Sequence, residues 1–249
     1  MNAHDVRINS NFRQVDKDYL KELEKYFDNG IGLTIDKLCA FAKYAPMGEI
    51  NKFIARYEIF KKILNINGSI VECGVFFGGG LMAWANFSSI LEPLNHLRKI
   101  IGFDTFSGFP SINKEKDAED AKEGDLSWES YEDLLKCIEV YNMFRPLGHI
   151  PKVELVKGNI LETVDKYLSE NKHLVISLLY LDVDLYEPTK VAIEKFLPRM
   201  PKGAIIAFDE LNIKNWPGET LAVLDTIGIN NLKIERFNFY PQISYAVLD

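Results

Sequence analysis

Two segments of the sequence each end an apolar run in carboxylates. Asp182 and Asp184 lie in YLDVDLYEPT, and Asp209 and Glu210 lie in AIIAFDEL. Such runs are typical of buried parallel strands, and open α/β sheets bind ligands where these strands end. Carboxylates gathered in one crevice repel each other unless a cation is present, and Mg²⁺ prefers oxygen ligands. The spacing also allows a structural alternative, caps and surface charges, because acids are common at strand ends.

A glycine-rich turn lies upstream in VECGVFFGGG, where Glu72 is followed by Gly74 and Gly78. A dinucleotide fingerprint needs a second glycine two positions after Gly74, but Phe76 stands there and would meet a pyrophosphate. The turn instead resembles the first motif of class I methyltransferases, which use S-adenosylmethionine (SAM). The glycines, with Val75 between them, would let the backbone turn tightly against the methionine part of SAM. Glu72 would help to hold the amino-acid portion.

Further positions extend this predicted cofactor site. Asp104, at the end of IIGFD, falls where nucleoside-binding folds place an acid against ribose hydroxyls, and Ser107 follows it. We favour ribose binding over a turn or cap role for Asp104. In LVKGN, Gly158 permits close approach, and Asn159 faces the adenine or caps a helix with equal weight. A glycine-rich helix start that binds another ligand, or none, remains an alternative.

The acidic residues suit methyl transfer to a hydroxyl. Transfer from a sulfonium requires an oxygen nucleophile, and an alcohol is a poor one until it loses its proton. A divalent cation lowers the pKa of a bound hydroxyl, and a nearby carboxylate can then accept the proton as general base. Asp182 and Asp184 flank the end of one expected strand and Asp209 ends the next, so the cluster is expected to have two walls at one edge of the sheet.

The elements that must position these residues alternate along the chain. Apolar runs predict strands at 69–72, 99–103, 153–157, 176–181 and 204–208, with helical intervals that imply parallel βαβ units. Runs at 232–239 and 242–248 are joined by a short connection and predict an antiparallel hairpin. Five parallel strands and a hairpin with one reversed strand resemble the α/β, Rossmann-like, seven-stranded fold of class I methyltransferases.

The chain has 249 residues, which suits one large α/β domain with small additions. Residues 1–66 are mostly helical in pattern and are expected to form a helical extension or lid packed on the core. Residues 67–249 are expected to form the methyltransferase core, with a charged, mobile loop near 111–127.

Composition excludes several classes of partner. The formal net charge of −7 argues against nucleic acid, which a basic face would bind. The three cysteines lack Cys-x-x-Cys spacing, so neither a disulfide framework nor a zinc site is expected. No signal-peptide core or membrane span is evident, and a cytoplasmic protein without a membrane partner is expected.

Five motifs occur in order: VECGVFFGGG, GFDTFSGFP, LVKGN, YLDVDLYEPT and GAIIAFDE. Together they resemble the macrocin O-methyltransferase (TylF-type) family, which methylates sugar hydroxyls with SAM and Mg²⁺. The resemblance implies that Asp182, Asp209 and Glu210 bind Mg²⁺ or Mn²⁺, that Asp182 also adjoins SAM, and that Asp184 is the general base. Glu210 stands where the family usually has a second Asp, and it can still ligate although it is one methylene longer. A homo-oligomer is also implied.

The acceptor is open at this stage. Family members act on sugars of antibiotics, on nucleotide-linked sugars or on surface-polysaccharide precursors, and the frequent Lys, Ile and Asn favour the last. Trp84, Trp128 and Trp216 line an acceptor pocket or belong to the core, with the core favoured. The alternatives are a catechol-type O-methyltransferase and a non-catalytic binding module. The intact set of Glu72 and the aspartates argues against the second.

Overall fold

The computed structural model describes residues 13–249 and divides the chain into two compact units, one reaching to Lys52 and one from Phe53 to Asp249. The first twelve residues of the expected N-terminal extension lie outside the described part. The division falls within α4 (Met47–Ile63), earlier than the expected limit at residue 66. The reason is that Ala55, Ile59, Phe60 and Ile63 of α4 are buried in the core of the second unit.

The first unit contains α2 (Gln14–Asn29), α3 (Thr34–Cys39) and the short 3₁₀ helix η1 (Phe41–Lys43). An aromatic cluster holds it together, because the Tyr44 ring stacks on Tyr26 at 5.5 Å and meets Phe27 edge-on at 5.3 Å. Lys37 donates hydrogen bonds to the carbonyl oxygens of Phe27 and Asp28. The packing of this unit on the core as a lid stays a prediction.

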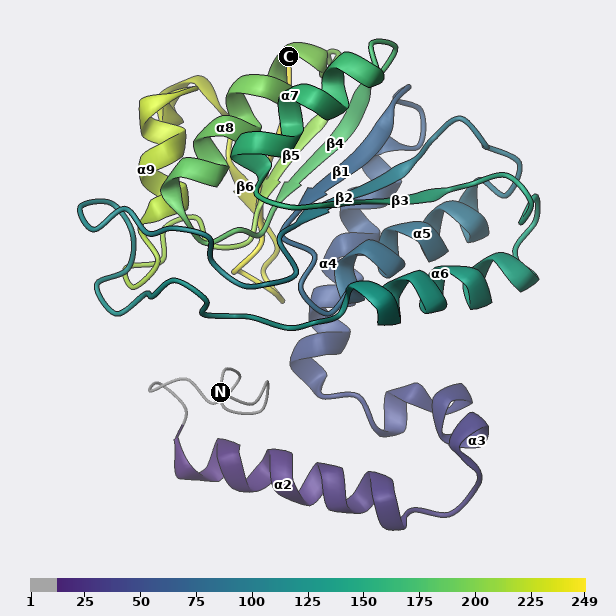
Figure 1. Ribbon diagram of the computed structural model, residues 1–249. Coiled ribbons are helices and arrows are strands. Elements are labelled where there is room, and N and C mark those ends of the chain that lie inside the picture. The colour runs from purple at the N-terminus through teal and green to yellow at the C-terminus, as the bar shows by residue number, and fades with distance from the viewer. Residues whose placement is uncertain (1–12) are drawn as a thin grey trace. The chain divides into compact units, whose positions relative to one another are not determined.

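The second unit is built on a seven-stranded sheet in the order β3-β2-β1-β4-β5-β7-β6 (Figure 1). The strands are β1 (Ser69–Cys73), β2 (Ile100–Asp104), β3 (Val153–Lys157), β4 (Ile176–Leu181), β5 (Ile205–Phe208), β6 (Glu235–Arg236) and β7 (Ser244–Val247). The first five are parallel, and β7 runs antiparallel to both β5 and β6. This confirms the predicted seven-stranded fold with its terminal hairpin. The run at 232–239 forms only the short β6, which lies at the sheet edge and pairs with one neighbour.

Helices cover both faces of the sheet (Figure 1). One face packs against α4, α5 (Gly79–Leu91) and α6 (Tyr131–Phe144), and the other against α7 (Ile160–Glu170), α8 (Tyr186–Phe196) and α9 (Gly218–Asp225). The 3₁₀ helices η2 (Leu197–Arg199) and η3 (Ile229–Asn231) complete the unit. Because both faces are buried, the central strands read as continuous apolar runs. No helix within residues 13–249 is both long and apolar enough to cross a membrane.

Hydrogen bonds between the strands continue past the strand ends into the predicted site. Gly74 N donates to Phe103 O at 2.9 Å, and Gly158 N donates to Asp104 O at 2.9 Å. On the other side of β1, Asp182 N donates to Cys73 O at 2.8 Å and Asp209 N donates to Leu181 O at 3.0 Å. The backbone of each motif is therefore fixed by its neighbour at one edge of the sheet.

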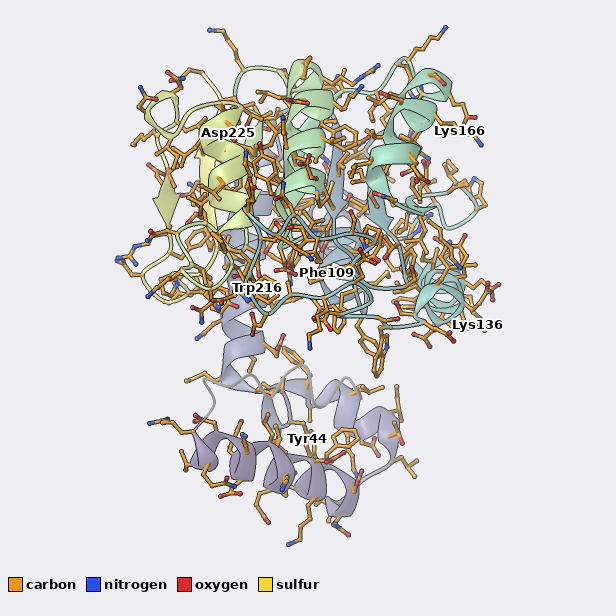
Figure 2. The ribbon with its side chains drawn as sticks, turned by 60° about the vertical axis from the view of Figure 1, so that its left-hand side comes forward. Tyr44, Phe109, Lys136, Lys166, Trp216 and Asp225 are labelled. Carbon is orange, nitrogen blue, oxygen red and sulfur yellow. The ribbon has the colours of Figure 1, made fainter. Side chains whose placement is uncertain are left out.

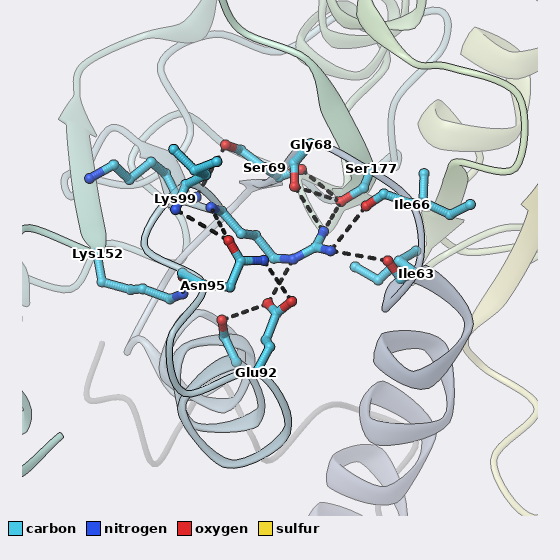
Figure 3. Close-up of polar contacts among 12 residues, drawn as sticks. Ile63, Ile66, Gly68, Ser69, Glu92, Asn95, Lys99, Lys152 and Ser177 are labelled. Atoms are coloured by element: carbon cyan, nitrogen blue, oxygen red, sulfur yellow. Dashed lines mark hydrogen bonds and ion pairs between the residues drawn. The ribbon is translucent and has the colours of Figure 1, made fainter. Parts of the chain in front are cut away.

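The opposite edge is tied together by the buried Arg98, which is 3% exposed. Figure 3 shows the polar contacts in this region, among them those of Glu92, Gly68 and Ser177. Its Nε donates to Glu92 Oε1 at 2.7 Å, and its Nη2 donates to the carbonyl oxygens of Ile63 and Ile66 at 3.1 and 3.0 Å. Its Nη1 donates to Gly68 O and to the Ser177 hydroxyl. One guanidinium thus joins the end of α4, the start of β1, the start of β4 and the segment after α5, which anchors α4 on the sheet.

Candidate active site

The predicted acids of β1, β4 and β5 share one face of the sheet. Side chains alternate along a strand, so Glu72 points to the same face as Ile70, and Asp182 and Asp209 continue the rows of Tyr180 and Ala207. Ile70, Tyr180 and Ala207 belong to the core cluster that packs against α4 and α5. Glu72 is 1% exposed and Asp209 is 4% exposed, so this face holds costly buried charge at its carboxyl edge.

A cation of the chain itself lies among these acids. Arg56 of α4 is 7% exposed, its Nη2 is 3.6 Å from Asp182 Oδ2, and its guanidinium lies 5.1 Å from the centre of the Tyr180 ring. Burial lowers the pKa of Arg56, but its interactions with Tyr180, Glu72 and the two aspartates outweigh burial and raise the pKa above its usual value. Sequence analysis assigned the neutralising charge to a metal alone and missed Arg56.

Asp209 is oriented by a buried tyrosine. Tyr180 is fully buried, and its hydroxyl donates to Asp209 Oδ1 at 2.5 Å. Burial and the adjacent Asp209 raise the pKa of Tyr180 well above its usual value, so the ring stays neutral and remains a donor. Trp84 packs against the same ring at 5.5 Å and is fully buried, which places it in the core and not in a pocket wall.

A further buried acid, Glu219, was not anticipated from the sequence. It lies in the first turn of α9, and its Oε1 accepts a hydrogen bond from Glu210 N at 3.0 Å. Burial, followed by the charges of Asp209 and Glu210, raises the pKa of Glu219 well above its usual value. Its Oε2 is buried and finds no hydrogen-bond donor among residues 13–249. The edge therefore gathers several carboxylates, one of which keeps a buried acceptor oxygen without a hydrogen-bond donor among residues 13–249.

This donor set has the chemistry that a hard divalent cation requires. Asp182, Asp209, Glu210 and Glu219 supply only oxygen ligands, and the unsatisfied Oε2 of Glu219 is an orphaned buried acceptor beside them. In the part of the chain that the structure describes, no three His, Cys, Asp or Glu side chains are already arranged around one metal position. The residues fit such an ion by the type of their donor atoms, with the unsatisfied Glu219 Oε2 beside them, and not by a preformed arrangement.

Asp184 lies in a strained turn between β4 and α8. Its φ is +60°, which is unfavourable for a residue with a side chain, and Leu185 N donates to Val183 O at 2.6 Å across it. The loops after β1, β2 and β5 also contain such residues, namely Phe76, Phe106 and Asn212. Strain of this kind collects at functional sites, because the surrounding structure must hold it in place.

The glycine turn packs directly against the backbone of the acidic segment that follows β4. Gly74 has φ +88°, and a Cβ on it would lie 1.8 Å from the carbonyl oxygen of Asp182. Gly78, with φ +86°, precedes α5, and a Cβ there would meet Leu134 of α6 at 2.1 Å. A Cβ on Gly80 would lie 2.1 Å from Glu72 Oε1 and 2.9 Å from Arg56 Nη2. The glycines therefore bring α5 and β4 into contact with the end of β1.

Asp104 connects two turns of the site. Its Oδ2 accepts hydrogen bonds from Val75 N at 2.7 Å and Phe76 N at 2.8 Å, and its Oδ1 accepts one from Phe106 N at 2.6 Å. The turn-forming role of Asp104, which was the alternative to ribose binding, is thus present in the structure. Carboxylate oxygens can accept more than one bond, so ribose contact stays a prediction beside it.

The remaining predicted positions lie at the same edge with different contacts. Asn159 caps α7, since its side chain accepts a hydrogen bond from Leu161 N at 3.1 Å. Gly158 has φ +132°, and Ser107 is exposed, with its backbone N donating to Thr105 Oγ1 at 3.2 Å. The cap role of Asn159 is therefore present, and its contact with adenine stays a prediction.

Comparison with solved structures places this fold and site in a class. The structure of CalS11, a calicheamicin methyltransferase, aligns with a TM-score of 0.89 and 31% identity over 97% of this chain and 95% of that chain. An apo structure of CalS11, described as a TDP-rhamnose 3'-O-methyltransferase, gives 0.83 and 29% over 97% of each. The O-methyltransferase NovP shares the fold, with a TM-score of 0.63 and 17% identity over 80% of each chain. The fold and site define a SAM-dependent O-methyltransferase of class I.

The family is defined more narrowly by its sequence model. The model of macrocin-O-methyltransferase (TylF) matches residues 54–225, which include every predicted site residue. The chain belongs to the macrocin-O-methyltransferase (TylF) family, as its motifs implied. No match was found among curated proteins.

The contact at Gly74 predicts a sharp difference between neighbouring glycines. Gly74→Ala should lower the free energy of unfolding by about 2–5 kcal/mol, because the new Cβ overlaps Asp182 O at a positive φ. Gly79→Ala is the matched control, since nothing lies within 4 Å of its added Cβ, and its stability should stay equal or rise. Urea denaturation of both variants measures this. Equal stability of the two would contradict the packing described.

The charge balance around Arg56 predicts a pH-dependent loss of stability. In Arg56→Met the buried acids lose the guanidinium, which should disfavour their charged forms in the folded state. The penalty should then be about 3–5 kcal/mol at pH 8 and shrink as the pH falls and the acids take up protons. Arg56→Lys, which keeps a cation, should show a smaller and flatter loss. Denaturation in EDTA at pH 8 and pH 5 measures both, and a pH-independent loss in Arg56→Met would refute the assignment.

Proposed function

We propose that the protein transfers a methyl group from SAM to a sugar hydroxyl with the aid of Mg²⁺ or Mn²⁺. The observation that carries this proposal is the gathering of carboxylates at the edge of β4 and β5, with the buried Glu219 Oε2 left without a hydrogen-bond donor among residues 13–249. This edge is in direct contact with the glycine turn through Gly74 and Asp182. A cofactor turn alone would serve many methyl acceptors. Carboxylates that could bind a cation beside this turn suit an alcohol as the acceptor, because an alcohol must lose its proton to react.

The cofactor would lie along the carboxyl ends of β1, β2 and β3. Glu72 would act on the amino-acid portion and Asp104 on the ribose. Asp104 holds the Val75 and Phe76 amides, which keeps the turn preformed for SAM. The full set of proposed cofactor positions is Glu72, Gly74, Val75, Gly78, Asp104, Ser107, Gly158, Asn159 and Asp182.

The metal would be held by Asp182, Asp209 and Glu210. A bound divalent cation lowers the pKa of an acceptor hydroxyl and orients it. Tyr180 keeps one oxygen of Asp209 fixed by its 2.5 Å hydrogen bond, and Glu219 fixes the Glu210 backbone at 3.0 Å. Asp184, held in its strained turn, would accept the proton of the hydroxyl as general base.

A nucleotide-linked sugar is the acceptor class that we propose to test first. CalS11 is described as acting on TDP-rhamnose, and its apo structure aligns over 97% of both chains at 29% identity. The composition of the chain favours a sugar destined for a surface polysaccharide. A panel should therefore contain dTDP-linked deoxysugars, other nucleotide sugars and, as the alternative, catechols.

Binding measurements test the cofactor and metal without an acceptor. Titration of SAM into EDTA-treated protein should release heat, and a following Mg²⁺ titration should release further heat that disappears in Asp182→Asn and Asp209→Asn. Asp165→Asn, whose side chain is 67% exposed on α7, is the matched control and should behave like wild type. If SAM gives no heat, the methyl-transfer proposal fails. Mg²⁺ heat that survives in both site variants would remove only the metal assignment.

The role of Asp184 is separable from binding. Asp184→Asn should keep SAM and Mg²⁺ affinity but lower kcat about 10²- to 10⁴-fold, because the amide cannot accept the hydroxyl proton. Methyl transfer from radiolabelled SAM to the acceptor that wild type uses measures this. A variant that retains wild-type kcat would show that another group is the base.

A further inference from the structure

We propose that Asp117, in the charged loop between β2 and α6, is a positioning residue that holds the turn carrying Asp184. The proposal deepens the proposed function, since it rests on Asp184 acting as the base. Asp117 does not reach the reacting atoms itself. It acts by fixing the backbone of the turn that contains Asp184, through a hydrogen bond from Tyr186 N.

The first observation is that Asp117 caps a helix that lacks a cap of its own. The residue before α8 is Leu185, whose side chain makes no capping hydrogen bond. Instead, Tyr186 N, the first amide of α8, donates to Asp117 Oδ1 at 2.7 Å in a buried contact. Asp117 Oδ2 accepts a second hydrogen bond from Asn113 N at 2.7 Å. A carboxylate at this end of a helix also interacts favourably with the helix dipole.

The second observation is burial within an otherwise exposed segment. Asp117 is 7% exposed and Ala118 is 6% exposed, whereas Glu119 and Asp120 beside them are exposed. Burial raises the pKa of Asp117, although its two backbone hydrogen bonds oppose that shift. Burying an acid in a surface loop is costly unless it satisfies groups that would otherwise be left unpaired. The Tyr186 amide is such a group.

The third observation connects Asp117 to Asp184 through Gly218. A Cβ on Gly218, the first residue of α9, would lie 2.6 Å from Tyr186 N, 2.7 Å from Asp117 Oδ1 and 2.9 Å from Asp184 O. These three groups therefore surround one point, and only glycine leaves room for them. A φ of +60° at Asp184 is unfavourable and persists only where the surrounding groups hold the backbone in place. The close packing of Asp184 O and Asp117 around Gly218 holds it there.

Neighbours of Asp117 strengthen the same attachment. Lys116 Nζ lies 2.6 Å from Asp225 Oδ2 of α9 and 3.7 Å from the centre of the Tyr186 ring. Asn113 Nδ2 donates to Glu187 Oε1 at 3.3 Å. Figure 1 shows the segment between β2 and α6 running across to α9, where these contacts are made. Residues 113–117 therefore contact the start of α8 and the end of α9 through hydrogen bonds and an ion pair.

The consequence is that movement of the loop and geometry of the base are coupled. If residues 113–117 leave, Tyr186 N loses its buried acceptor and the strained turn at Asp184 loses its support. The cofactor turn is attached to Asp104 and β1 and is not held by this contact. Loss of Asp117 should therefore lower kcat and leave SAM affinity unchanged.

The test compares Asp117→Ala and Asp117→Asn with Asp120→Ala, an exposed acid of the same loop. Hydrogen exchange of the segment 183–187 is followed in the intact protein with SAM and Mg²⁺, and kcat and the Kd of SAM are measured alongside. In Asp117→Ala, exchange should rise about tenfold, as expected for one lost buried hydrogen bond. The kcat should fall about 10- to 100-fold with an unchanged Kd of SAM, because the base is displaced. Asp117→Asn, which keeps one acceptor oxygen, should be intermediate.

The outcomes separate this proposal from the proposed function. Exchange and kcat in Asp117→Ala that match those of Asp120→Ala would overturn the proposal, as would faster exchange with wild-type kcat. If Asp117→Ala does not fold, Asp117→Asn decides by the same two readouts. The exchange arm needs no acceptor, so if wild type transfers no methyl group, the proposed function fails while the attachment of the Asp184 turn is still decided.

Discussion

The site depends on a balance of buried charge at the carboxyl edge of β1, β4 and β5. Glu72, Asp182 and Asp209 point to one face, and Arg56 is the cation that α4 inserts among them. Taking these groups out of water is costly, and their mutual attraction repays the cost only where geometry and hydrogen bonds are good. The anchoring of α4 by Arg98 at the far edge of the sheet therefore matters for the active site, because it fixes the helix that carries Arg56.

Arg56 is a cation that the chain itself places among these acids. Beside it, burial and then the charges of Asp209 and Glu210 raise the pKa of Glu219 well above its usual value. The carboxylate oxygens at this edge are of the type that a divalent cation would bind. Hydrogen bonds from Asp182 N and Asp209 N hold the backbone at this edge, and a backbone fixed in this way needs little reorganisation at the time of reaction.

Sequence reasoning recovered the strands and the motif positions because those signals are local. Apolar runs that end in Asp, and glycines at fixed offsets, are visible without any partner. Arg56 carried a weaker signal, since it shares the helical spacing of the buried Ile59, Phe60 and Ile63 and so had to face the core. Asp117 carried none, because its partner Tyr186 is remote in sequence and its loop is rich in exposed acids. Buried polar partners of this kind are set by tertiary packing and not by local pattern.

The glycine turn after β1 and the acids after β4 are joined by direct contacts. Gly74 lies against the Asp182 carbonyl, and Asp182 N donates a hydrogen bond to Cys73 O. On the other side of the turn, Asp104 accepts a hydrogen bond from Val75 N. These contacts leave little freedom for variation in the strands themselves. Freedom remains in the loops after β2 and β5, which meet where the ring centres of Phe109 and Trp216 lie 6.1 Å apart (Figure 2). Since Asp117 of the loop after β2 accepts a hydrogen bond from Tyr186 N, a change in this loop must preserve that contact to keep the turn at Asp184 in place.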